Sequence, residues 1–188
     1  MNLTPERIVA RYREQGALAY EGEGITQLQH AWQCGQLAAQ AGVPAPLQLA
    51  AWLHDLGHLL TGLEGSPTTR GIDDGHEGLA ARALRPLFGE AVAEPVALHV
   101  QAKRYLVAVH PVYRERLSPD SVRSLALQGG PMAQPEALRF RSLPWADEAL
   151  RLRAWDDAGK LSHWQPADAE AALHELEQLM QRVQRAAV

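Results

Sequence analysis

Apolar residues recur along this chain at intervals of three and four, the spacing of helices that bury one face, and no run alternates as a half-buried strand would. Capping residues and breaks at glycine or proline divide the pattern into segments. The predicted helices span residues 4–15, 26–40, 46–58, 75–87, 92–109, 111–117, 119–128, 134–155 and 168–187. Residues 61–75, rich in glycine and proline, are expected to form a long loop of the kind that often carries function. We therefore predict an all-α fold.

The chain has 188 residues, 46% hydrophobic and 21% charged, which indicates one globular domain over residues 1–188. Its formal net charge of -4 does not provide the positive surface that binding to a phosphate backbone requires, so no nucleic-acid partner is expected. The single cysteine, Cys34, excludes an intrachain disulfide and is interpreted as a small core residue. The N-terminal segment lacks the apolar stretch of a signal peptide, and the longest apolar run carries Asp55 and two histidines, so no membrane span is expected. These features predict a cytoplasmic protein and leave its oligomeric state open.

The predicted third helix is apolar on every side, which indicates a buried helix, yet it carries His54, Asp55 and His58. A buried carboxylate without partners is strongly destabilising, so Asp55 needs a cation or a dense set of hydrogen-bond donors. An adjacent His–Asp pair can bring one imidazole and one carboxylate to the same metal ion. This helix alone also permits a histidine–carboxylate hydrogen bond in an ordinary core.

Further histidines and acids occur on other predicted helices. His30 lies on the second helix, His76 begins the helix after the long loop, and His99 lies in an apolar stretch. Asp156 follows a tryptophan near the end of a long helix. Each of these residues alone is more often a core or surface residue than a ligand. Together they form one ordered series: His30, His54–Asp55, His76, His99 and Asp156.

This ordered series resembles the HD-domain superfamily of helical metalloenzymes, whose pattern is H…HD…D with two further histidines in its dinuclear members. The resemblance extends from residue 30 to residue 156. It implies a compact HD-domain bundle with a metal-binding region over about residues 20–157 and a C-terminal helix over about residues 168–187. Carried over position by position, it implies that one metal is held by His30, His54 and Asp156, the other by His76 and His99, and that Asp55 bridges both. Such imidazole and carboxylate ligands suit iron or manganese.

Most HD-domain proteins are phosphohydrolases, and a smaller branch consists of diiron oxygenases. That branch includes myo-inositol oxygenase and the PhnZ-like mixed-valent enzymes of organophosphonate catabolism. Tyr20 and Glu23 resemble the Tyr-x-x-Glu motif of the PhnZ-like enzymes. The resemblance implies that Tyr20 occupies an iron position when substrate is absent and that Glu23 binds the amino end of the substrate. The two residues also have an ordinary interpretation, as a surface tyrosine and a solvated turn residue.

Five more positions resemble the phosphonate-binding residues of the PhnZ-like branch: His58, Lys103, Ser121, Ser124 and Arg153. A phosphonate carries up to two negative charges, so the lysine, the arginine and a protonated His58 would provide charge-assisted donors, and the serines neutral ones. The alternative for Lys103 and Arg153 is that they are charges at the rim of amphipathic helices. Three aromatic residues are candidates for lining a pocket around the amino end: Trp52, Tyr105 and Trp145.

The resemblance thus implies a dioxygen-dependent oxidoreductase with Tyr20, Glu23, His58 and Lys103 as catalytic residues. Its expected cofactors are two iron ions, mixed-valent Fe(II)/Fe(III), with dioxygen as co-substrate. The expected reaction cleaves the C–P bond of a small 1-hydroxyphosphonate, 2-amino-1-hydroxyethylphosphonate or its trimethylammonio analogue, to phosphate and a carboxylic acid. The nearest alternative is a metal-dependent HD phosphohydrolase acting on a nucleotide or another phosphate ester. A non-catalytic helical binding module is disfavoured because no member of the ligand series is missing.

Overall fold

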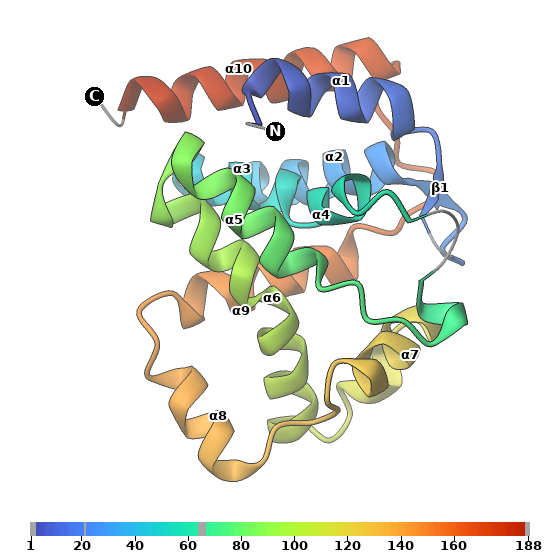
Figure 1. The fold of residues 1–188 in the computed structure, drawn as a ribbon, viewed down its shortest axis with the longest axis vertical. Helices are drawn as coiled ribbons and strands as arrows, with labels where there is room; N and C mark the ends of the chain where they lie inside the picture. Colours follow the sequence, from blue (N-terminus) through green and yellow to red (C-terminus); the bar gives the residue numbers. More distant parts are fainter. Residues whose placement is uncertain (1–2, 21, 64–66, 187–188) are drawn as a thin grey trace.

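The computed structural model describes residues 3–20, 22–63 and 67–186. In these residues the regular structure is helical apart from one short ladder, which confirms the predicted all-α fold (Figure 1). The longer helices are α1 (Pro5–Gln15), α2 (Gln27–Gln40), α3 (Ala45–Leu53), α5 (His76–Phe88), α6 (Glu90–Val109), α9 (Ala146–Ala158) and α10 (Ala169–Ala186). The shorter elements are α4 (Leu56–Leu60), α7 (Pro119–Leu127), α8 (Gln134–Arg141) and the 3₁₀ helices η1 (Thr68–Arg70) and η2 (Arg114–Arg116).

Three helices begin at residues whose side chains cap them. In α1, α2 and α7 the hydroxyl oxygens of Thr4, Thr26 and Ser118 accept the backbone N–H three residues further on, at 3.2 or 3.3 Å. Each bond satisfies a donor that the first turn of a helix leaves without a partner. The capping residues therefore fix where these helices start.

The main core lies where α2, α6, α9 and α10 pack around α3, and α5 joins it by packing against α6. Leu49, Ala50 and Leu53 of α3 have no exposed surface. The amphipathic helix α10 turns its apolar residues inward and lies beside α1, although the two helices stand at opposite ends of the chain (Figure 1). None of the helices in the described ranges has both the length and the hydropathy needed to cross a membrane. The core thus forms a single compact bundle.

The predicted helix over residues 46–58 is interrupted, and its two parts are α3 and α4. The chain leaves helical geometry at Asp55, where φ is -97° and ψ is 8°, so this residue stands between two helices. Gly57 allows α4 to pack closely against the start of α5, because a Cβ on Gly57 would lie 2.0 Å from the carbonyl oxygen of His76. Helix α4 therefore touches the start of α5 through backbone atoms, which brings Asp55 beside His76.

Other boundaries also differ from the prediction. A two-stranded antiparallel ladder of β1 (Ala19–Tyr20) and β2 (Ile25–Thr26) is too short to produce an alternating pattern in the sequence. The predicted helix over residues 134–155 is divided into α8 and α9 near Pro144, because a proline disfavours helical geometry in the residue before it. Residues 111–117 form a turn with η2 in place of a helix, and α6 begins at residue 90 instead of 92.

Candidate metal centre

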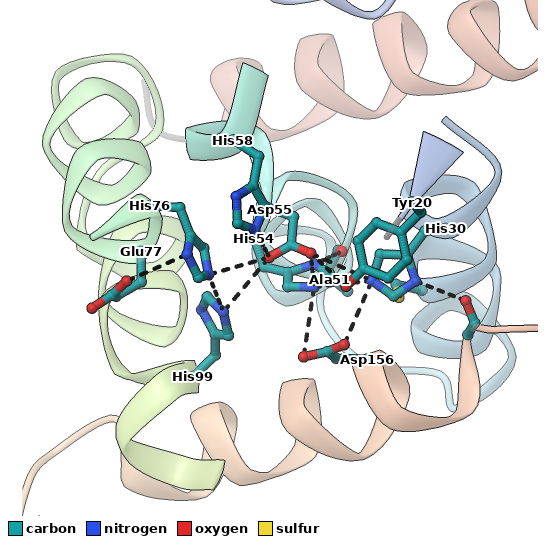
Figure 2. Close-up of polar contacts among 12 residues, drawn as sticks. Tyr20, His30, Ala51, His54, Asp55, His58, His76, Glu77, His99 and Asp156 are labelled. Atoms are coloured by element: carbon teal, nitrogen blue, oxygen red, sulfur yellow. Dashed lines mark hydrogen bonds and ion pairs between the residues drawn. The ribbon is translucent and has the colours of Figure 1, made fainter. Parts of the chain in front are cut away.

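The six residues of the predicted ligand series come together inside the bundle, from five separate segments (Figure 2). Helix α2 provides His30, the α3–α4 junction provides His54 and Asp55, and α5, α6 and α9 provide His76, His99 and Asp156. Their exposed fractions lie between 0% and 6%. A buried group of four imidazoles and two carboxylates requires a cation or complete hydrogen bonding.

Asp55 lies between two pairs of histidines and turns one oxygen toward each pair. Its Oδ2 atom is 3.6 Å from Nε2 of His30 and 3.4 Å from Nε2 of His54. Its Oδ1 atom is 3.5 Å from Nε2 of His76 and 3.7 Å from Nε2 of His99. A carboxylate in this position can serve two metal ions, one through each oxygen. This is the bridging position that the resemblance implies for Asp55.

The remaining distances fit two sets of ligands around this bridge. The Nε2 atoms of His30 and His54 are 3.3 Å apart, and those of His76 and His99 are 3.2 Å apart. Asp156 joins the first pair, with carboxylate oxygens 3.5 Å from His30 and 3.9 Å from His54. Two atoms about 2.1 Å from one ion and at a right angle to each other are about 3.0 Å apart. The clusters therefore have nearly the spacing of coordinating atoms.

The hydrogen bonds of the four histidines determine which ring nitrogen faces the cluster. Each Nδ1 atom lies 2.7 to 2.9 Å from an oxygen that can only accept, so Nδ1 carries the proton and donates it. In the neutral rings Nε2 is then unprotonated, and its lone pair points toward the neighbouring Nε2. Two facing lone pairs repel each other unless a cation lies between them. The donor set therefore fits a metal pair, with hydrogen-bonded outer partners of the kind that metal-binding histidines have.

Burial and the mutual contacts set the charges of these groups. Burial and His54 lower the pKa of His30 to about 4 and that of His99 well below its ordinary value. Burial opposes ionisation of Asp55, but His54, with further histidines, holds its pKa well below the usual range. His54 is the exception: burial lowers its pKa, but Asp55 and Asp156 together raise it. The two acids thus attract a positive charge to the point where the predicted metal site lies.

Cys34 lies close to His30 and His54, and its sulfur is a possible metal ligand by distance. Its Sγ atom, however, is 3.8 Å from Nδ1 and 3.7 Å from Nε2 of His30, so it is nearly equidistant from the two ring nitrogens and not in line with the Nε2 lone pair. Burial and Asp156 raise the pKa of the thiol well above its ordinary value. Both observations favour the interpretation of Cys34 as a packed core residue.

Tyr20 lies on the His30 side of the cluster (Figure 2). Its hydroxyl donates to Oδ2 of Asp55 at 2.9 Å, and its ring stacks on His30 with centroids 4.0 Å apart. Burial and Asp55 raise the pKa of the phenol well above its ordinary value, so the hydroxyl stays protonated. The structure therefore places Tyr20 against the six-residue cluster and not at the surface.

His58 lies on the opposite side, where its ring stacks on His76 with centroids 3.9 Å apart. Its Nδ1 atom is 2.7 Å from Asp74, whose other oxygen is 2.9 Å from Nδ1 of His76. Asp74 thus orients two histidines at once, and sequence reasoning missed it. Its position two residues before His76 was the available signal, because a metal-binding histidine needs an acceptor for its second ring nitrogen.

A cavity of about 830 Å³ opens onto the cluster. Its walls include the metal-ligand candidates Asp55, His76, His99 and Asp156. They also include all seven residues that the resemblance assigns to catalysis or substrate binding: Tyr20, Glu23, His58, Lys103, Ser121, Ser124 and Arg153. The three aromatic candidates for the amino-end pocket are absent from these walls. Trp52 is buried in the core, and Tyr105 packs against Phe140, so that expectation is wrong.

Lys103 and Arg153 are buried and not at a solvent-exposed rim. Lys103 donates to Oγ of Ser124 at 2.7 Å, and burial together with the Arg153 guanidinium lowers the pKa of this lysine to about 7. Arg153 donates to Asp156 at 2.7 Å and to the hydroxyl of Tyr113 at 3.0 Å, and it also pairs with Asp157. Arg153 therefore holds Asp156 in place whatever else it contacts.

Lys160 also lines the cavity, and sequence reasoning missed it. Its Nζ atom is 3.2 Å from Oε1 of Glu23 and 3.4 Å from Oγ of Ser121. The chain contains only two lysines, Lys103 and Lys160, among 18 basic residues. The scarcity of lysine was the available signal in the sequence. Both lysines lie in the described walls of the cavity. Glu21, inside the predicted Tyr-x-x-Glu motif, lies outside the described residues.

Comparison with known proteins gives relatives over most of the chain. Hydroxymethylphosphonate dioxygenase of Gimesia maris is 37% identical over 186 residues, which are 96% of this chain and 92% of the relative. The 1-hydroxy-2-(trimethylamino)ethylphosphonate dioxygenase (glycine-betaine-forming) of Leisingera caerulea is 36% identical over 159 residues, 84% of this chain and 80% of the relative. An uncharacterised protein of Acanthamoeba polyphaga mimivirus is 35% identical over 156 residues, 82% and 71% of the two chains. No family model matches the chain.

Proposed function

This chain belongs to the family of the hydroxyphosphonate dioxygenases, and on that premise we propose that it uses dioxygen to cleave the carbon–phosphorus bond of a small 1-hydroxyphosphonate. The products are phosphate and a carboxylic acid. The protein is thereby an oxygenase, within the class of oxidoreductases. The observation that carries the proposal is that one cavity joins the six-residue cluster to the buried cationic side chains of Lys103 and Arg153.

We propose that the cluster holds two iron ions in the mixed-valent Fe(II)/Fe(III) state. His30, His54 and Asp156 would hold one ion, His76 and His99 the other, and Asp55 would bridge both. Bound there, the pair would supply the one-electron chemistry that a reaction with dioxygen requires. The absence of a thiolate-rich donor set and the predominance of imidazoles and carboxylates support this assignment over a structural zinc site.

The residues of the cavity would bind and orient the substrate. Lys103 and Ser124, already hydrogen-bonded to each other, would donate to phosphonate oxygens. Ser121 lies one helical turn from Ser124 and would add a neutral donor. Arg153 would act mainly by fixing Asp156 and by adding positive charge at the cavity wall. A protonated His58, oriented by Asp74, would donate to the substrate from its remaining ring nitrogen.

Tyr20 would respond to the arrival of substrate. Its hydroxyl contacts Oδ2 of Asp55, beside the position proposed for the first ion. A substrate that approaches the cluster must displace or share this contact. Tyr20 would therefore keep water and small anions away from the cluster until the substrate arrives. The residue belongs to the short strand β1, which pairs with β2.

The proposal is tested by measuring iron content, dioxygen consumption and phosphate release on the same preparation. Protein loaded with iron is expected to consume dioxygen and release phosphate in equal amounts when a 1-hydroxyphosphonate is added. Asp55→Ala removes the proposed bridging ligand and should abolish iron loading and phosphate release. Asp147→Ala removes an exposed acid of α9 and is the matched control that should retain both. Cleavage of phosphate esters without dioxygen, supported by manganese, magnesium or cobalt, would instead establish the phosphohydrolase.

Three wider predictions accompany this function. We propose that residues 1–188 form one HD domain with its metal-binding region over about residues 20–157. A cytoplasmic location and action without nucleic acid or membrane partners stay predictions from composition and charge. The small phosphonate is the partner on which the proposed activity depends.

A further inference from the structure

The two named relatives act, by their names, on substrates of different charge. Hydroxymethylphosphonate has no cationic group, whereas the second relative's substrate carries a trimethylamino group. Identities of 37% and 36% do not distinguish these possibilities for the present chain. The charges that line its cavity do distinguish them.

Glu23, the residue expected to bind an amino end, already faces a cation of the protein. The Nζ atom of Lys160 lies 3.2 Å from Oε1 of Glu23, and the two side chains are only 13% and 12% exposed. The same ammonium lies 3.4 Å from the hydroxyl oxygens of Ser118 and Ser121, and 5.6 Å from the ring centre of Tyr20. It therefore stands inside the cavity, between Glu23 and a serine expected to bind phosphonate.

The backbone around Lys160 is held in place on both sides. The carbonyl oxygen of Gly159 accepts a hydrogen bond from Nδ1 of His30 at 2.7 Å. The backbone N–H of Leu161 donates to Oε1 of Gln33 at 2.9 Å. Both bonds tie the segment to α2, which carries a proposed metal ligand. The backbone from which Lys160 extends is therefore held in place, and its side chain lines the cavity.

An ammonium-bearing substrate would meet two obstacles near Glu23. The carboxylate is already neutralised by a partly buried ion pair, so it offers little net attraction. The Lys160 ammonium is a like charge a few ångströms away, and like charges brought together during binding act against the wrong partner. A substrate without a cation meets neither obstacle, and the second lysine adds positive charge near its phosphonate.

We propose that Lys160 supplies the cation that Glu23 binds, so that this enzyme favours a 1-hydroxyphosphonate without a cationic group, such as hydroxymethylphosphonate. The inference rests on the proposed function and narrows its substrate class. The ammonium-bearing substrates that the sequence resemblance suggested are then expected to be the poorer ones. Lys160 is in this view a specificity-determining residue.

The test compares three substrates on iron-loaded enzyme: hydroxymethylphosphonate, 2-amino-1-hydroxyethylphosphonate and its trimethylammonio analogue. The kcat/KM for the first, measured by phosphate release, is expected to exceed the others by about tenfold or more. Lys160→Met leaves Glu23 unpaired and should shift this ratio toward the ammonium-bearing substrates by about tenfold or more. Lys160→Arg keeps the ion pair and should keep the preference.

A matched control breaks an ion pair outside the cavity. Arg13 pairs with Glu170 at 2.8 Å on the surface, and Arg13→Met should leave the substrate ratio unchanged. Calorimetric titration without dioxygen gives a second readout, since binding of the ammonium-bearing substrates should strengthen in Lys160→Met without any turnover.

The outcomes separate the two proposals. A wild-type preference for an ammonium-bearing substrate would overturn the role of Lys160. An unchanged ratio in Lys160→Met that retains its iron would do the same, as would a lost preference in Lys160→Arg that retains its iron. Failure to release phosphate from any hydroxyphosphonate would instead contradict the proposed function itself.

Discussion

The folded protein disfavours the charged form of the Lys103 side chain. The side chain is buried, and burial together with Arg153 lowers its pKa to about 7, against about 10.4 in an unfolded chain. Between these two values the unfolded chain binds more protons at this position than the folded protein does. The contribution of Lys103 to stability therefore rises with pH across this window, and near pH 7 the residue destabilises the fold.

Lys103→Met tests this directly, because methionine fills similar space without a charge. The variant is expected to be more stable than the wild type at pH 7, and this advantage should shrink by about 3 kcal/mol or more toward pH 10, since each unit of pKa shift is worth about 1.4 kcal/mol. Urea unfolding at several pH values measures the difference. Arg151→Met, at an exposed position, should show no such trend. A stability difference independent of pH would show that Lys103 keeps its ordinary pKa.

Among single residues, the sequence predicts the candidate metal ligands better than the residues that contact them or line the cavity beside them. His54, Asp55 and His99 are conspicuous because polar residues in apolar helices need an explanation. Asp74 and Lys160 lie in polar loops, where acids and lysines are common. Their importance comes from contacts across many residues of sequence, such as the approach of Lys160 to Glu23. Only the folded chain determines such contacts.

Among the elements, the junction of α4 with α5 depends on one missing side chain. A Cβ on Gly57 would lie 2.0 Å from the carbonyl oxygen of His76 and 2.7 Å from its Cα atom. Both are backbone atoms, so the two helices would have to separate. His76 would then move away from Asp55, from which it is now separated by 3.5 Å. The glycine thus links helix packing to the geometry of the cluster.

Gly57→Ala is therefore expected to lower stability by about 1–3 kcal/mol, the usual cost of overpacking, and the melting temperature by about 2–12 °C. Iron held by the His76 side should be lost more readily than iron held by the His30 side. The control is Gly78→Ala in α5, where the nearest atom is the flexible end of Arg82 at 3.3 Å. That change should be neutral or stabilise by about 0.5–1 kcal/mol. Equal effects of the two substitutions would contradict this role of Gly57.

The helix boundaries show which features of the fold can be predicted from a local sequence pattern. Capping residues and the apolar period predict most helix starts, including α1 and α7. The break between α3 and α4 leaves no such signal, because apolar residues continue on both sides of Asp55 through residue 60. It is produced by tertiary packing, namely the contact of Gly57 with α5. The break between α8 and α9 has a local cause, Pro144, and the apolar period across it obscures that cause.

In the whole molecule, the candidate centre is built from segments that are distant in sequence. Ligand candidates come from α2, the α3–α4 junction, α5, α6 and α9, and these elements also pack the main core. Helix α8 contributes none of them and packs in a smaller apolar cluster around Phe140. Bound metal would therefore cross-link the elements that form the core, while α8 would stay outside this cross-link.

This arrangement predicts how iron changes stability across the molecule. A ligand that binds only the folded state at 100 times its Kd stabilises by about 2.7 kcal/mol, which corresponds to a rise in melting temperature of about 5–10 °C for a chain of this size. In hydrogen exchange, peptides from α2, α5, α6 and α9 should gain protection on loading with Fe(II) under nitrogen. Peptides from α8 should gain much less, because α8 can open locally while the metal stays bound.

Asp55→Ala is the control for this experiment, since it removes the bridge between the two sets of ligands and should abolish both the thermal shift and the selective protection. A melting temperature unaffected by iron would contradict a buried metal pair. So would a gain in protection that is as large in α8 as in α6. The experiment depends on where the ligands come from and not on turnover, so it tests the metal centre independently of the proposed reaction.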